Sequence, residues 1–128
     1  MIINLPLWVQ TSSTNIFILN MNNYRNAHHQ VLNKAKIEFK EEIQEQLKKI
    51  ERKFKQFRLI YTLYKNDKRS CDTNNICSII DKFFCDALTE AKIIKDDSYK
   101  YLIESTFKWG GIDTENPRVE VQIIEVKE

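Results

Sequence analysis

The strongest constraint on the fold is an apolar stripe in residues 76–91 that repeats with the period of an α-helix. Its members recur at i, i+3, i+4 and i+7: Ile76, Ile79, Ile80, Phe83, Phe84, Ala87, Leu88 and Ala91. One continuous stripe at 3.6 residues per turn predicts a helix with a single buried face. We expect Asn74 or Asn75 to cap its N-terminus, because a short side-chain oxygen accepts from free N–H groups of the first turn.

The remaining pattern predicts a mixed α+β fold in one domain, residues 1–128. A second helix is expected over residues 30–54, with a buried stripe of Phe39, Ile43, Leu47, Ile50 and Phe54. Strands are expected at residues 2–10, 56–64, 99–109 and 118–127, with a further short strand possible at 16–19. Residues 20–30 are expected to form a polar loop, and residues 110–117 a hairpin connection. We therefore expect a small mixed sheet of about four to five strands with two main helices packed on it.

The charge of the chain is modest, but its distribution is uneven. The 128 residues are 42% hydrophobic, enough for a core, and carry a formal charge of +2. Basic residues concentrate between Lys48 and Arg69: Lys48, Lys49, Arg52, Lys53, Lys55, Arg58, Lys65, Lys68 and Arg69. Such a region fits contact with nucleic acid, and it equally fits a solvated helix face followed by an edge strand.

The cysteines and the apolar segments exclude several classes of protein. The three cysteines form no C-x-x-C pair, and the adjacent His28 and His29 lie far from them in sequence, which argues against a structural zinc site. No apolar run approaches the roughly 18 residues of a membrane-spanning helix. With no signal sequence, we expect a cytoplasmic protein in a reducing setting.

Acidic residues gather at both ends of the helical stripe. Asp72 precedes it, Asp96 and Asp97 follow it, and Asp81 and Asp86 lie within it. Carboxylates held close together repel one another unless a hard cation such as Mg²⁺ neutralises them. The alternative is structural, with Asp72 as a helix cap and the Asp pair as a turn.

Lys82 and Asp86 lie on one flank of the predicted helix and are spaced for an i, i+4 ion pair. Lys82 could instead direct its charge at a phosphate. Asp81 lies on the opposite flank, so helical geometry argues against its sharing a site with Lys82.

Four segments form a recognisable set: KRSCDTNN, DKFFCDALTEAKIIKDDSYK, the opening LPLW and the closing NPRVEVQIIE. Together they resemble the RusA family of Holliday junction resolvases over most of the chain, most specifically over about residues 68–100. The family shows a D-x-D-N motif, a helix with Lys four residues before Asp-Ala-Leu, and an Asp-Asp pair after the helix. The counterparts here are 72–75, Lys82, 86–88 and 96–97.

This resemblance implies a homodimeric, Mg²⁺-dependent endonuclease, encoded by a bacterium or phage, that nicks four-way DNA junctions symmetrically. It implies catalytic roles for Asp72, Asp97 and Lys82, with Asn74 or Asp96 as further metal ligands. Asn74 departs from the family, which has an aspartate there, so a full negative charge is lost unless Asp81 or Asp96 compensates. The interval from Asn75 to Asp86 is also about one helical turn longer, which moves the N-terminal end by about 5.4 Å.

Basic residues are expected to hold the DNA backbone: Arg25, Lys65, Lys68 and Arg69. Two other interpretations remain open. One is a non-catalytic module that binds DNA junctions through a degraded metal site. The other is a structural interaction protein whose basic stretch is only solvated surface.

Overall fold

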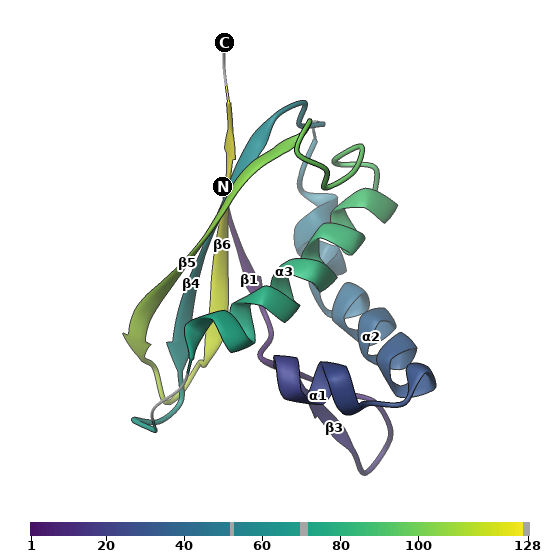
Figure 1. Cartoon of the computed structure of the whole chain (residues 1–128), viewed down its shortest axis with the longest axis vertical. Helices are drawn as coiled ribbons and strands as arrows, with labels where there is room; N and C mark the ends of the chain where they lie inside the picture. Colours follow the sequence, from purple (N-terminus) through teal and green to yellow (C-terminus); the bar gives the residue numbers. More distant parts are fainter. Residues whose placement is uncertain (52, 70–71, 127–128) are drawn as a thin grey trace.

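A four-stranded mixed sheet is the central element of the fold (Figure 1). In this computed structural model, which describes residues 1–51, 53–69 and 72–126, the strand order is β1-β6-β4-β5. The strands are β1 (Ile2–Leu5), β4 (Phe57–Lys65), β5 (Leu102–Ile112) and β6 (Arg118–Glu125). β4 pairs with β5 in parallel, whereas β6 runs antiparallel to both β1 and β4. The predicted α+β class and mixed sheet are confirmed.

Two long helices, α2 (His29–Lys48) and α3 (Thr73–Glu90), cover one face of this sheet (Figure 1). The rings of Phe39 on α2 and Phe83 on α3 meet edge to face at 5.6 Å, and Phe84 packs similarly on Tyr61 of β4 at 6.3 Å. The stripe predicted for α3 is buried except for Ala91, which is exposed as its C-cap. Alternate residues of β4 and β6 are buried as well: Phe57, Leu59, Tyr61, Leu63, Val119, Val121 and Ile123.

The N-terminal region departs from its prediction in two places. The expected strand at 2–10 breaks at Pro6 into β1 and β2 (Trp8–Gln10), and β2 forms a separate two-stranded sheet with β3 (Ile16–Ile18). The expected loop at 20–30 contains a third helix, α1 (Met21–Asn26). Asn20 caps α1 by accepting from the N–H of Asn23. An asparagine that is typical of loops therefore starts a helix here.

The predicted hairpin between the last two strands is wrong. β5 and β6 do not pair with each other, because β4 lies between them. Both glycines lie inside β5: a Cβ on Gly110 would come within 2.7 Å of Thr62 Cγ2, and Gly111 has a φ of 131°. They therefore serve close strand packing and a β-bulge instead of a turn.

Three smaller points concern the end of α2, the membrane and the residues outside the described ranges. Helix α2 ends at Lys48, before the expected 54, although Ile50 and Phe54 are buried as predicted. Among the described residues, no helix has both the length and the apolar character needed to cross a membrane. Arg52 of the basic stretch, Cys71 of the RusA-like segment and Lys127 of the last strand lie outside the described residues.

Candidate functional site

Asp81 is the most unusual carboxylate of α3. It faces the sheet, where the hydroxyl of the buried Tyr61 donates a hydrogen bond of 2.5 Å to its Oδ1. The thiol of Cys85, one turn further along the helix, points at the same oxygen at 3.5 Å. Asp81 is thus held in a fixed orientation by a strand and by its own helix.

The electrostatics of Asp81 connect it to the loop that follows the helix. Burial raises the pKa of Asp81, and the nearby negative charge of Asp97 raises it further, against the hydrogen bonds and Lys82, which lower it. Burial also raises the pKa of the Cys85 thiol, with the charges of Asp81, Asp97 and Asp86 adding to the effect. The charge of Asp97, in the loop after the helix, therefore acts on Asp81, whereas helical geometry alone argued against Asp81 as part of the site.

Asp96 and Asp97 have different environments. Asp96 accepts a 2.7 Å hydrogen bond from the N–H of Ser98 and so stabilises the turn leading to β5. The side chain of Ser98 and this N–H both lower the pKa of Asp96. Asp97 is exposed. Both line an open hollow of about 370 Å³ together with Asp86, Glu90, Lys36 and Lys40. Lys40 and Glu90 form an ion pair across its rim.

Asp72 lies at the other end of α3. It is the N-cap, in place of the predicted Asn74 or Asn75, and its Oδ1 accepts from the N–H of Asn74 at 2.9 Å. The helix rise separates Asp72 from Asp81 by about 13.5 Å along the axis. The structure thus gives Asp72 a capping role, while a joint Asp72–Asp97 metal site stays a prediction.

Lys82 and the asparagines of α3 face α1. The Lys82 ammonium lies 5.9 Å from the centre of the Tyr24 ring, and within the described chain no ion pair joins it to Asp86. The Asn75 Oδ1 accepts from the N–H of Met21 at 3.0 Å and so ties the start of α1 to the first turn of α3. Asn74 is exposed beside it.

The four predicted DNA-contacting residues lie on α1, at the end of β4 and in the segment that follows β4, and α1 contacts α3. Arg25, Lys68 and Arg69 are exposed, and Lys65 ends β4 half-buried. Arg69 donates to the Asp67 carboxylate at 3.0 and 3.1 Å, so part of its charge is compensated. Arg25 follows Tyr24 on α1, whose ring Lys82 approaches, so these two cations lie on neighbouring helices.

The comparisons with known proteins add no family. Neither the protein-family models nor the curated proteins contain a match to the chain. Over the ranges that the structure describes, no three side chains of His, Cys, Asp or Glu converge as a group able to hold a metal ion.

The pairing of Tyr61 with Asp81 was missed by sequence reasoning, although a signal for it existed. Tyr61 occupies an inward position of β4, and a buried phenol needs a hydrogen-bond partner. Asp81 directly follows two buried residues of the α3 stripe, Ile79 and Ile80, so it borders the face that packs on the sheet. Combining the two patterns would have pointed to the contact.

Proposed function

We propose that this protein is a Mg²⁺-dependent, structure-selective endonuclease that resolves four-way DNA junctions by paired nicks. The observation that carries the proposal is the half-buried Asp81 carboxylate, which Tyr61 and Cys85 hold in place and whose pKa responds to the charges of Asp97 and Lys82. The RusA-like motifs lead to the same activity from the sequence. Such an enzyme would act in DNA recombination and repair, in the cytoplasm of a bacterium or of a phage-infected host.

The donor set fits a magnesium ion. Mg²⁺ in enzymes that act on phosphates is commonly held by one or two carboxylates, with waters and substrate oxygens completing the shell. Asp81 and Asp97 would supply two carboxylates, and a cation there would offset the negative charge of Asp97 that raises the pKa of Asp81. Bound there, Mg²⁺ supplies Lewis-acid stabilisation of the charge that develops on the scissile phosphate.

The protein residues would divide the remaining work. Tyr61 and Cys85 orient the Asp81 carboxylate, and Asp97 supplies the second one. Lys82 attracts the phosphate and stabilises its developing charge. Asp72, Asn74 and Asp96 keep the ligand roles that the resemblance implies for them, as proposals.

The DNA would be held by its backbone. Arg25, Lys65, Lys68 and Arg69 supply cations for phosphate contacts, which position a duplex without reading its sequence. Selectivity for a branched shape would come from a homodimer whose two sites are spaced to meet two opposed strands.

A second function is a non-catalytic module that binds junctions. It is favoured by the Asp72 geometry, since this carboxylate is engaged as a cap while an amide, Asn74, stands where the family has its second aspartate.

A cleavage assay on a synthetic four-way junction with Mg²⁺ separates the two functions. We expect paired nicks from the wild type and a loss of about 10²–10³-fold for Asp81→Asn and Asp97→Asn, the range seen when one electrostatic stabiliser is removed. Junction binding, measured by gel shift, should persist in both variants. Glu115→Gln, a change at an exposed carboxylate before β6, is the control.

Two outcomes would contradict the enzyme. Tight junction binding without nicks at any Mg²⁺ or Mn²⁺ concentration would favour the module, and wild-type cleavage by Asp97→Asn would remove the proposed site. A rate increase in Asn74→Asp would add position 74 to the metal site.

A further inference from the structure

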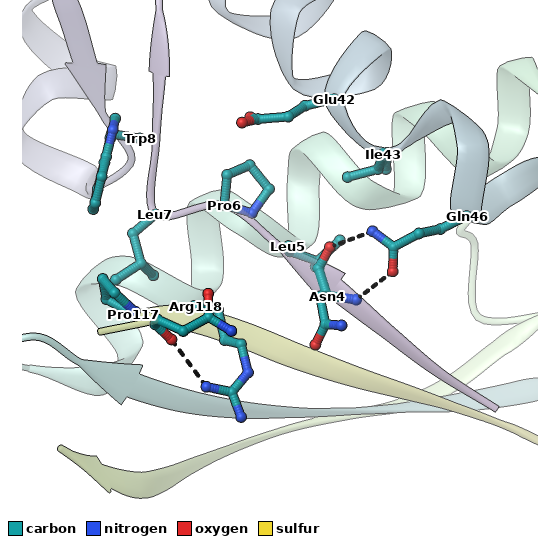
Figure 2. A pocket seen from close by; sticks show the side chains of 11 residues that line it. Asn4, Leu5, Pro6, Leu7, Trp8, Glu42, Ile43, Gln46, Pro117 and Arg118 are labelled. Atoms are coloured by element: carbon teal, nitrogen blue, oxygen red, sulfur yellow. Dashed lines mark hydrogen bonds between the residues drawn. The ribbon is translucent and has the colours of Figure 1, made fainter. Parts of the chain in front are cut away.

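The two edges of the main sheet differ. β1 is four residues long, and the Gln46 amide of α2 brackets Asn4 by accepting from its N–H at 2.7 Å and donating to its C=O at 2.8 Å (Figure 2). β5 is 11 residues long, and no strand in the described part of the chain pairs with its outer side. One edge is therefore short and occupied by a side chain, and the other is long and open.

The open edge carries apolar side chains at the surface. Ile103, Trp109 and Ile112 are 46%, 50% and 41% exposed. Long, apolar edge strands invite pairing with another chain, and proteins usually protect them with several charges, a proline or a covering loop. β5 has no proline and only two charged residues, Glu104 and Lys108, which have opposite sign.

The pairing of β5 with β4 fixes which face these residues occupy. Phe107 contacts the ring of Tyr61 and so lies on the helix-covered face. Glu104, Thr106 and Lys108 occupy the opposite, uncovered face, where the Thr106 hydroxyl donates to Glu104 at 2.8 Å. The two charges thus flank Thr106 symmetrically on one face.

We propose that β5 pairs antiparallel with β5 of a second copy of this chain, about a two-fold axis at Thr106. In this register Glu104 lies opposite Lys108 of the partner subunit, twice per dimer, and Ile103 lies opposite the partner's Trp109. Cross-strand pairs of opposite charge and of apolar side chains both stabilise antiparallel strands.

Other registers are worse electrostatically. A two-fold axis at Glu104 or at Lys108 sets like charges directly against each other, which destabilises a strand pair. An axis at Ser105 or Phe107 leaves both charges opposite uncharged residues. Only the register centred on Thr106 compensates both charges and keeps each residue facing its own side of the sheet.

This inference deepens the proposed function, because it specifies the dimer on which symmetric cleavage rests. Edge-to-edge pairing about this axis joins two four-stranded sheets into one, with the α2 and α3 helices of both copies on the same side. Tyr61 contacts both Phe107 of β5 and Asp81, so the two candidate sites would flank the seam. Two opposed strands of one junction could then meet both sites.

Charge reversal tests the register, with sedimentation equilibrium as the readout. We expect the wild type to have twice the 15.3 kDa mass of the chain. Glu104→Lys or Lys108→Glu alone should weaken dimerisation by about tenfold or more, because both cross-strand pairs become repulsive. The double exchange, Glu104→Lys with Lys108→Glu, should restore the dimer, as should mixing the two single variants.

Lys100→Glu, a reversal at an exposed residue just before β5, should leave the dimer intact and is the matched control. Circular dichroism verifies that each variant is folded. A monomeric wild type at all concentrations, or a double exchange that fails to restore dimers weakened by the single changes, would overturn the interface. A dimer that cuts no junction contradicts the nuclease alone, whereas junction cleavage by a monomer contradicts the interface alone.

Discussion

At the scale of single residues, Asp81 combines a structural cost with the proposed chemistry. Its carboxylate is half-buried, and burial, with a smaller contribution from the charge of Asp97, raises its pKa above the ordinary 3.8. A protein tolerates such a group when the charge is useful, since enzyme sites concentrate perturbed carboxylates. The cost itself can be measured without knowing any substrate.

We expect Asp81→Asn to be more stable than the wild type at pH 7 in the absence of divalent ions. An acid whose pKa is raised by folding binds its proton more tightly in the native state, so wild-type stability falls as the pH rises above 3.8. The fall ends once the pH exceeds the raised pKa of the native protein. Asn keeps an oxygen to accept from Tyr61 but has no charge to bury.

Urea unfolding from pH 3 to pH 8 checks this expectation. The two proteins should converge below pH 3.8 and separate above it. Asp86→Asn, at an exposed carboxylate on the same helix, should show no comparable gain. An Asp81→Asn protein that is less stable at pH 7 would show that the pair with Tyr61 depends on the charge.

The residues of the candidate site were predictable in unequal measure. The acidic ends of α3 are visible in the sequence, and so is the Asp97 carboxylate. The influence of the Asp97 charge on Asp81 was not, because it depends on the position of the loop that follows Ala91. Helical spacing describes a single helix and carries no information about a loop that returns to it.

At the scale of elements, Asp72, the N-cap of α3, has been given both a structural and a catalytic role. Asp72 caps the helix through its bond to the Asn74 N–H. Asn is as good an N-cap as Asp but lacks the charge of a strong Mg²⁺ ligand. The two roles can therefore be separated by substitution.

Asp72→Ala should lower the free energy of unfolding by about 0.5–2 kcal/mol, the usual cost of losing a cap, and Asp72→Asn should leave it nearly unchanged. If Asp72 is also a metal ligand, as the resemblance implies, Asp72→Asn should lose junction cleavage while keeping full stability. Urea unfolding and the cleavage assay give the two readouts. Wild-type cleavage by Asp72→Asn would restrict this residue to capping.

The elements with strong periodicity were predicted well. α3, β4 and β6 have stripes or alternations that their burial confirms. α1 escaped detection because six residues are too few to display a period, and its helix depends on caps and on the tether from Asn75. The strand order was not predicted, because two glycines between two β-patterns resemble a hairpin turn. In the structure Gly110 is required by the close approach of Tyr64, and Gly111 follows the bulge in β5.

At the scale of the whole molecule, the two hydrogen bonds between Gln46 and Asn4 limit how far sheets can join. They engage the N–H and C=O groups of Asn4 on the sheet edge opposite β5 (Figure 2). In the proposed dimer both outer edges would be β1, so assembly would stop at two copies. Closed assembly of this kind distinguishes a dimer from a growing fibre.

Gln46→Ala should lower the free energy of unfolding by about 1–2 kcal/mol and favour association beyond the dimer, since two net hydrogen bonds are lost and the β1 edge opens. Urea unfolding and light scattering at increasing concentration measure the two effects. Gln44→Ala, at an exposed position of the same helix, is the control. A Gln46→Ala protein with unchanged stability and mass would show that the hydrogen bonds of Gln46 do not protect the β1 edge from pairing.

The position of β6 has a consequence for how the protein is made. β6 lies between β1 and β4, so the strand nearest the start of the chain has no partner until residues 118–125 have left the ribosome. β4, α3 and β5 can assemble earlier, because β4 and β5 pair directly in parallel. During synthesis the inner edge of β4 would wait unpaired, and nascent chains would be most prone to mispairing in the interval before β6 emerges.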